Sequence, residues 1–152
     1  VWLAYLADKN KPNSIWIDRL GFATDGSLCY AGRSAWGLIQ TGNALAPEAE
    51  PAGPYVAVLS GQCSSLRFSS SMPGCGKVEV GDGTTWGIAQ GEVDGRHMAM
   101  FLTGAEEQEE IYGKTFPCPV TGGWPQAKHG GGFADAYAIL LDLGAGAEGG
   151  AE

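Results

Sequence analysis

Short runs rich in apolar and β-favouring residues alternate along the chain with turns built from glycine and aspartate. Residues 17–32 and 86–104 each contain a strand-like run, an Asp-Gly pair, a second strand-like run and a closing glycine. Asp-Gly between such runs is a strong hairpin signal, because both central residues of a type I′ turn need positive φ. The pattern therefore predicts two β-hairpins, which turn at Asp25-Gly26 and at Asp94-Gly95.

Each predicted hairpin has one further strand-like run before it and one after it. These runs are residues 1–6 and 55–59 for the first hairpin, and residues 66–72 and 136–141 for the second. The same order of four strands thus occurs twice, and the second unit carries the longer loop.

The repeated order predicts an all-β chain made of tandem four-stranded antiparallel units. The first unit spans residues 1–62 and the second spans residues 63–143, with a long acidic loop at 105–132 and a Gly/Ala/Glu-rich tail at 144–152. Four short strands with a core that one unit cannot bury alone are typical of a β-propeller blade. A single β-sandwich shows turn signals at similar spacing and is the alternative, but internal repetition favours blades.

Several motifs of the chain occur in a known repeat family. They are Gly81-Asp82-Gly83, Gly87-Ile88-Ala89, Asp94-Gly95, Leu102-Thr103-Gly104, Thr115-Phe116-Pro117 and residues 130–137 in the second unit, with Asp25-Gly26, Tyr30-Ala31-Gly32 and residues 55–59 in the first. In these motifs the chain resembles the bacterial seven-bladed β-propeller repeat family, known from secreted and surface proteins. The resemblance covers most of the chain and implies a propeller fold. The motifs are structural and imply no activity.

The chain departs from that family in three respects. Ala52-Gly53-Pro54 stands where the first unit would carry a triple glycine and an aspartate, the loops are longer, and the cysteines are not a family feature. In the second unit Asp135 precedes its strand, where we expect it to accept hydrogen bonds from turn amides. Two blades leave exposed faces and unpaired edges. Further blades are therefore expected from the parent chain, a partner subunit or a homo-oligomer.

Composition agrees with many short strands. Glycine accounts for 25 of the 152 residues and proline for 8, and each interior glycine costs a helix about 1 kcal/mol relative to alanine. The formal charge is −8 and the 9 Lys and Arg residues do not cluster, so nucleic-acid binding is not expected.

The longest apolar run, residues 136–141, is far shorter than the about 20 residues of a membrane-spanning helix, so no transmembrane segment is expected. Because the chain begins at Val1, we interpret it as a processed product, an excised domain or a proteolytic remnant.

The cysteines bear on the cellular compartment. Cys29, Cys63, Cys75 and Cys118 include no Cys-x-x-Cys spacing, which argues against a zinc ribbon or a thioredoxin-type motif. Cys63 could pair with Cys75 across a short loop and Cys29 with Cys118, but the sequence leaves the connectivity open. A disulfide would indicate the periplasm, the cell surface or the medium. Free buried thiols that pack as small hydrophobes are the alternative.

The loop at residues 105–132 holds the candidate binding residues, which are Tyr112, Trp124, Lys128 and His129. Loops longer than about 12–15 residues are uncommon unless they are functional or disordered. One interpretation is a ligand-binding rim on which Trp124 and Tyr112 stack against a sugar ring. The alternative is a solvated acidic turn with Trp124-Pro125 packed over the edge of a sheet.

No motif identifies a reaction, and no catalytic residue is assigned. His97 lies in a predicted strand, and His129 would need a carboxylate from the acidic run to act as a general base. Ser69 to Ser71 read as strand residues, and no serine stands in a G-x-S-x-G elbow. The aspartates fall on turns where aspartate is common, without the alternating acids of a calcium loop, so no metal or cofactor is expected.

Taken together, the sequence predicts a non-catalytic binding or scaffolding module of an extracytoplasmic protein, which acts through loops on one face of a propeller and has carbohydrate as one candidate ligand. Part of a polysaccharide-degrading propeller enzyme is the first alternative. A structural subunit of a larger surface or membrane-associated complex is the second.

Overall fold

The computed structural model describes residues 14–23, 25–36, 38–47, 53–62, 64–72, 87–105, 108–111, 114–120, 128, 130 and 135–144. These residues form strands and no helix, which confirms the prediction of an all-β chain. The strands are β1 (Ser14–Phe22), β2 (Leu28–Trp36), β3 (Gly53–Leu59), β4 (Leu66–Ser71), β5 (Gly87–Val93), β6 (Arg96–Ala105), β7 (Gln108–Ile111), β8 (Lys114–Pro117) and β9 (Asp135–Asp142).

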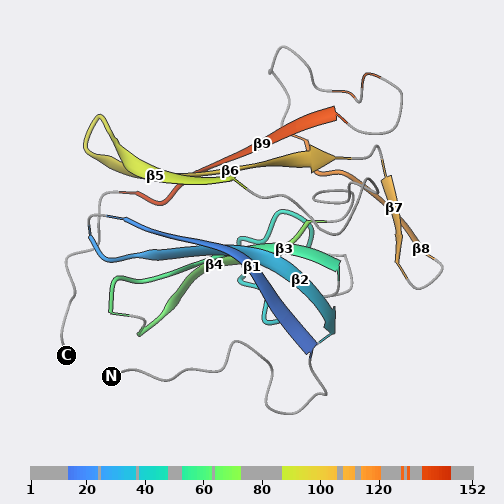
Figure 1. Cartoon of the computed structure of the whole chain (residues 1–152), viewed down its shortest axis with the longest axis horizontal. Coiled ribbons are helices and arrows are strands. Elements are labelled where there is room, and N and C mark those ends of the chain that lie inside the picture. Colours follow the sequence, from blue (N-terminus) through green and yellow to red (C-terminus); the bar gives the residue numbers. More distant parts are fainter. Residues whose placement is uncertain are drawn as a thin grey trace.

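The first four strands form one antiparallel sheet in chain order, β1-β2-β3-β4, which is the lower layer in Figure 1. The sequence pattern assigns residues 66–72 to the second unit, whereas the structure pairs β4 with β3. The connection from β3 to β4 is held near its two ends, because the Ser60 Oγ accepts hydrogen bonds from the N–H groups of Ser64 and Ser65, each at 3.1 Å. The four-stranded sheet therefore runs past residue 62. Residues 1–6, predicted as the opening strand, lie outside the described residues.

The second sheet has three antiparallel strands in the order β5-β6-β9 and forms the upper layer in Figure 1. Its hairpin turns at Asp94 and Gly95, whose φ angles of 50° and 73° confirm the predicted pair of positive-φ residues. The other predicted turn differs, because five residues separate β1 from β2 and of the pair Asp25-Gly26 only Gly26 has positive φ, 80°. Both hairpins exist, but only the second has the expected two-residue turn.

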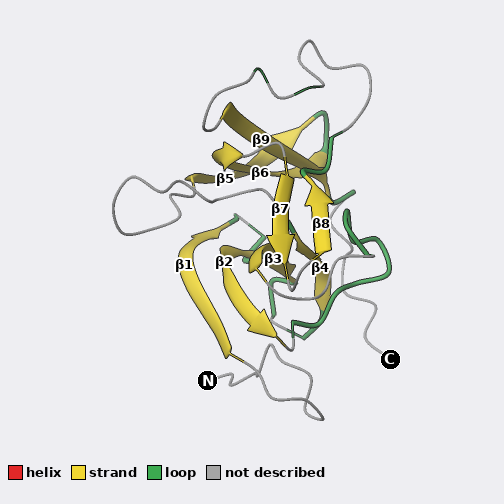
Figure 2. Cartoon of the chain, turned by 90° about the vertical axis from the view of Figure 1, so that its right-hand side faces the viewer, coloured by secondary structure: helices red, strands yellow, loops and turns green. Residues whose placement is uncertain are grey.

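The predicted acidic loop at 105–132 contains a small hairpin of its own. β7 and β8 pair with each other, with Gln108 opposite Pro117 and Ile111 opposite Lys114. Figures 1 and 2 show this hairpin at one side of the molecule, where it runs across the direction of both larger sheets. Near the end of the same segment, the Gly130 N–H donates a hydrogen bond to the carboxylate of Asp135, which was expected to accept from a backbone amide and is the first residue of β9.

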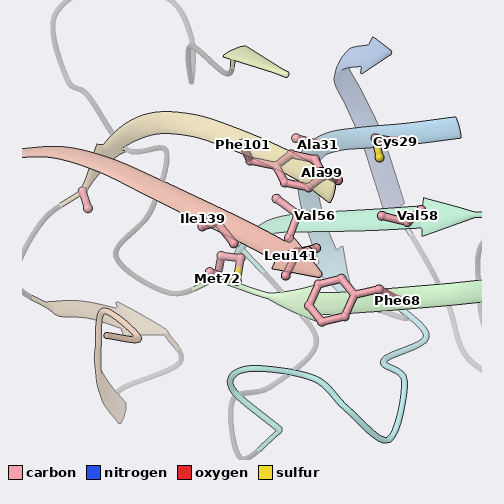
Figure 3. Packing of buried hydrophobic residues seen from close by; sticks show 11 residues of the cluster. Cys29, Ala31, Val56, Val58, Phe68, Met72, Ala99, Phe101, Ile139 and Leu141 are labelled. Atoms are coloured by element: carbon pink, nitrogen blue, oxygen red, sulfur yellow. The ribbon is translucent and has the colours of Figure 1, made fainter. Parts of the chain in front are cut away.

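The two larger sheets face each other across one apolar core. Alternate residues of β2, β3 and β4 meet alternate residues of β6 and β9, and Figure 3 shows them converging between the layers. The buried members are Cys29, Ala31, Val56, Val58, Phe68, Met72, Ala99, Phe101, Ala105, Ile139 and Leu141. Burial of this surface supplies the main force that holds the sheets together.

The opposite face of the first sheet is also apolar. Tyr30 and Tyr55 pack edge to face there with their ring centroids 5.9 Å apart, beside Ala57 and Leu59. Residues 38–46 run along β4, where the Thr41 N–H donates to the Ser69 carbonyl at 3.0 Å and the Thr41 Oγ1 accepts from the Ser69 N–H at 2.9 Å. This connection satisfies part of the backbone edge that β4 would otherwise leave open.

Candidate functional site

The residues predicted to line a sugar-binding rim lie for the most part outside the described chain. Lys128 is described and exposed, whereas Tyr112, Trp124 and His129 fall outside the described residues. The rim, with carbohydrate as its ligand, therefore stays a prediction.

Of the four cysteines, Cys29 and Cys118 are among the described residues. Cys29 is a fully buried free thiol on β2, inside the core between the sheets, and it forms no disulfide with Cys118. Burial, with the nearby negative charge of Asp25, raises the pKa of the Cys29 thiol to about 12 against the opposing effect of Arg67. The thiol therefore stays protonated at neutral pH and packs as a small apolar group. Cys63 and Cys75 lie outside the described residues. A disulfide between them, and the extracytoplasmic location that it would indicate, therefore stay predictions.

A cluster of polar side chains links the two sheets by hydrogen bonds. We call it the bridging cluster, and its members are Asp25, Ser27, Arg67, Gln90 and His97. The first three belong to the first sheet and its β1–β2 turn, and the last two belong to β5 and β6 of the second. Ser27 is fully buried and His97 is 5% exposed, whereas the Asp25 side chain is 37% exposed, so the cluster lies at the boundary between the core and the solvent.

Arg67 connects the two sheets through its guanidinium. Its Nη1 donates to the Ser27 Oγ at 3.3 Å and lies 3.2 Å from the His97 Nδ1, while its Nη2 donates to the Leu143 carbonyl at 2.5 Å. His97 and Leu143 belong to adjacent chain segments of the second sheet, since the Leu143 N–H also donates to the His97 carbonyl at 2.9 Å. A single arginine on β4 thus binds both sheets, and its planar fork suits several acceptors at once.

Both ring nitrogens of His97 have polar partners within hydrogen-bond distance. The Gln90 Nε2 donates to the Gly21 carbonyl at 2.9 Å, which turns the Gln90 Oε1 toward the His97 Nε2 at 3.0 Å. An acceptor at that distance places a proton on Nε2. The other nitrogen, Nδ1, faces both the Arg67 Nη1 and the Asp25 Oδ2, the latter at 3.3 Å. Neutral His97 therefore accepts from Arg67 at Nδ1, and protonated His97 donates to Asp25.

Asp25 carries the negative charge of the cluster. Its carboxylate accepts the Ser27 N–H at 2.8 Å and the Ser27 Oγ–H at 2.9 Å, and the Arg67 Nη1 lies 3.7 Å away. Burial alone would raise the pKa of Asp25, but the two hydrogen bonds from Ser27 and the charges of His97 and Arg67 outweigh it and hold the pKa below its ordinary value. Asp25 is thus charged whenever the protein is near neutral pH.

The hydrogen bonds of the bridging cluster join the two sheets and do not have the arrangement of a catalytic triad. In a serine triad the hydroxyl donates to the histidine that activates it, whereas the Ser27 Oγ donates to Asp25. The His97 Nε2, which would have to act on a nucleophile, is occupied by Gln90. Among the described residues no group of three or more His, Cys, Asp or Glu side chains could hold a metal ion.

The sequence indicated the local structure around some members of this cluster, but not that they contact one another. It placed His97 in a strand and Asp25 on a turn, both correctly, but it assigned no role to Arg67 or Gln90. Arg67 and His97 are 30 residues apart in the chain, and a single sequence holds no signal that relates them.

No family model matches the chain, and no curated protein or solved structure is detectably similar to it. The likeness to bacterial propeller repeats therefore remains a prediction from short motifs. Within the part of the chain that is described, no helix is long and apolar enough to cross a bilayer.

We expect Arg67→Met to destabilise the fold by about 2–4 kcal/mol, because it leaves buried acceptors in both sheets without their charged donor. The apolar stem is kept, so packing changes little. Arg96→Met is the matched control, since Arg96 pairs with Asp142 in an exposed ion pair at 2.6 Å and should lose much less. Urea denaturation measures both free energies of unfolding, and equal losses would contradict the bridging role of Arg67.

The depressed pKa of Asp25 predicts acid sensitivity with a defined sign. Because the folded pKa lies below the ordinary value of 3.8, the charged carboxylate stabilises the fold above that pH, and this contribution disappears as pH falls through the folded pKa. We expect Asp25→Asn to be less stable than the unmodified chain near neutral pH and to approach it as pH drops below 3.8. A difference in the free energy of unfolding that stays constant from neutral to strongly acidic pH would contradict the prediction.

Proposed function

We propose that this chain is a non-catalytic binding or scaffolding module of an extracytoplasmic β-propeller protein, and that it joins neighbouring sheets through its outer faces. The observation that supports this proposal most directly is the apolar outer face of the second sheet. We define the outer face as the side of β5-β6-β9 that points away from the first sheet, which is the upper side of that layer in Figure 1.

The strand register defines which residues share this outer face. One row across the three strands is Gly87, Leu102 and Ala138, and the next is Ala89, Met100 and Leu140. Leu102 is 47% exposed and Leu140 is 45% exposed, so these side chains are open to water. On the outer face of the described strands, charge appears only at one end, where Arg96 and Asp142 pair with each other.

An apolar outer face is unusual for a sheet in a two-layer protein. In a β-sandwich the outward residues of each strand are polar, because only the inner faces meet. Here β6 alternates between buried residues, such as Phe101, and exposed apolar residues, such as Leu102. Both faces of the second sheet are thus suited to contact another layer. In a propeller each blade is covered by a neighbour on both faces, which is the arrangement that this pattern favours over an isolated sandwich.

The first sheet supports the same interpretation. Six of the seven residues of β3 are buried, which means that this strand is covered on both of its faces. Its four strands are connected in chain order, as in a propeller blade. The polar residues of the bridging cluster are occupied in joining the sheets, so the described part of the chain favours a scaffolding role over catalysis.

We expect the isolated chain to self-associate through this face and Leu102→Lys to be monomeric. Exposed apolar patches of this kind mark interaction sites, and a lysine would place an unpaired charge inside the contact. Val120→Lys is the control, because Val120 is 60% exposed and lies outside the outer face. The lysine moves the net charge from −8 toward neutrality, so general charge repulsion cannot explain a loss of association. Sedimentation velocity over a range of concentrations gives the result, and an unmodified chain that stays monomeric at every concentration would overturn the proposal.

The non-catalytic part of the proposal has its own measurement. Incubation of the chain with polysaccharides of several linkage types, followed by a reducing-end assay, should show no release of sugar above background. Release by the purified chain would favour the alternative of a polysaccharide-degrading enzyme.

A further inference from the structure

We propose that His97 keeps the two sheets joined in both of its protonation states, because it exchanges one partner on the first sheet for another when it binds a proton. The partner of the neutral ring is Arg67 of β4, and the partner of the protonated ring is Asp25 of the β1–β2 turn. This inference does not depend on the proposed function. It assigns to His97 a role in the alignment of the sheets as the pH changes.

The exchange takes place at one nitrogen of the His97 ring. The Nδ1 atom lies 3.2 Å from the Arg67 Nη1 and 3.3 Å from the Asp25 Oδ2. A neutral ring with its proton on Nε2 has a lone pair at Nδ1, which accepts from the guanidinium, whereas a charged ring has an N–H there, which donates to the carboxylate. The two partners are almost equally distant, so the change of partner needs a proton but no movement of either sheet. Histidine commonly changes its charge between about pH 8 and pH 5.

Ser27 supplies a second partner to each of the two exchanging groups. When His97 is protonated, the Arg67 Nη1 still donates to the Ser27 Oγ at 3.3 Å. When His97 is neutral, the Asp25 carboxylate still accepts the N–H and the Oγ–H of Ser27. Because a carboxylate oxygen has more than one lone pair, Asp25 can accept from Ser27 and His97 together. Neither protonation state therefore leaves a charged group of the cluster without a hydrogen bond, which would be costly in this partly buried place.

Two further links between the sheets do not involve the Nδ1 atom. The Arg67 Nη2 donates to the Leu143 carbonyl at 2.5 Å, and the Gln90 Nε2 donates to the Gly21 carbonyl at 2.9 Å. Gln90 also binds the His97 Nε2 at 3.0 Å, which fixes the orientation of the ring. The ring therefore stays in place while its charge changes.

Asp25 and Arg67 have opposite effects on the protonation of His97, because the carboxylate attracts the proton and the guanidinium repels it. Among the described residues, these two are the charged side chains within hydrogen-bond distance of the ring. Glu92 lies opposite His97 in the register of β5 and β6, but its side chain is exposed, so water screens its charge.

The other titratable groups near the cluster have little influence on the His97 ring. On β6 itself, Arg96 is exposed and pairs with Asp142. Burial raises the pKa of the Cys29 thiol on β2 to about 12, so this group is uncharged. The segment that follows β9 offers the His97 backbone an uncharged peptide N–H and an uncharged carbonyl.

Urea denaturation between about pH 8 and pH 5 tests the inference with two variants that each keep one partner. Stability rises with pH wherever the unfolded chain binds more protons than the folded chain. In Asp25→Asn the ring faces Arg67 alone, so the folded chain binds the proton less readily, and acidification should lower the urea midpoint relative to the unmodified chain. In Arg67→Met the ring faces Asp25 alone, and acidification should raise the midpoint, again relative to the unmodified chain. We expect each change to alter the unfolding equilibrium constant on the order of tenfold across this range.

Glu92→Gln and Arg96→Met are the matched controls, because they remove the same charges at exposed positions near His97. Both should follow the pH dependence of the unmodified chain. Addition of His97→Gln to either test variant should remove its distinct pH dependence. Shifts of the same sign in Asp25→Asn and Arg67→Met, or shifts that remain in the His97→Gln background, would overturn the inference. A control that shifts as much as its test variant would do the same.

Nuclear magnetic resonance of the unmodified chain gives a test that does not depend on the folding of a variant. Long-range proton–nitrogen correlation spectra should show a proton on Nε2 alone at about pH 8 and on both ring nitrogens of His97 at about pH 5. Nuclear Overhauser contacts between Gly21 of β1 and Ile88 of β5, which lie against each other, should be retained in both states. Three results would each overturn the inference: loss of these contacts on protonation, a neutral ring with its proton on Nδ1, or a ring that stays neutral at about pH 5.

Discussion

The apolar inner faces of the two sheets cover each other, and the remaining features of the structure are arranged around that contact. Val56 and Val58 of β3 meet Phe101 of β6 and Ile139 of β9 in one continuous core, as Figure 3 shows. Burial of apolar surface contributes about 25 cal/mol per Å², and neither sheet could obtain it without the other layer. The strands must therefore turn apolar residues inward, which constrains their register against their neighbours even though β1–β2 and β3–β4 contain register shifts.

The bridging cluster fixes the relative position of the two sheets, which apolar packing alone does not specify. Apolar surfaces can slide against each other, but Arg67 reaches the Leu143 carbonyl and the His97 ring only when the sheets have one relative position. Gln90 adds a second link by binding Gly21 of the first sheet and His97 of the second. Buried polar networks of this kind are costly when incompletely satisfied, which makes alternative alignments of the sheets unfavourable.

The outer faces connect this architecture to the proposed role. The alternation that places Phe101 in the core places Leu102 in water, and on β1 it leaves Phe22 exposed. A protein that ended at two layers would be expected to carry polar residues at these positions. The exposed apolar residues on both outer sides therefore support the proposal that the two sheets are layers of a larger assembly.

Local chemistry in the sequence indicated the strands of the two larger sheets, the turn at Asp94-Gly95 and the hydrogen bond of Asp135, because each depends on residues close together in the chain. The pairing of β4 with β3 was not predictable, because the sequence of a strand does not identify the strand with which it pairs. The boundary between two repeat units can also be drawn at more than one place in the chain. The bridging cluster was hidden for the same reason, since Arg67 approaches His97 only when two sheets pack. The sequence by itself thus indicated where the strands of the two larger sheets form, whereas it did not indicate the β7–β8 hairpin inside the predicted loop. Only the tertiary structure decided which faces meet, because that choice depends on burial and electrostatics between distant segments.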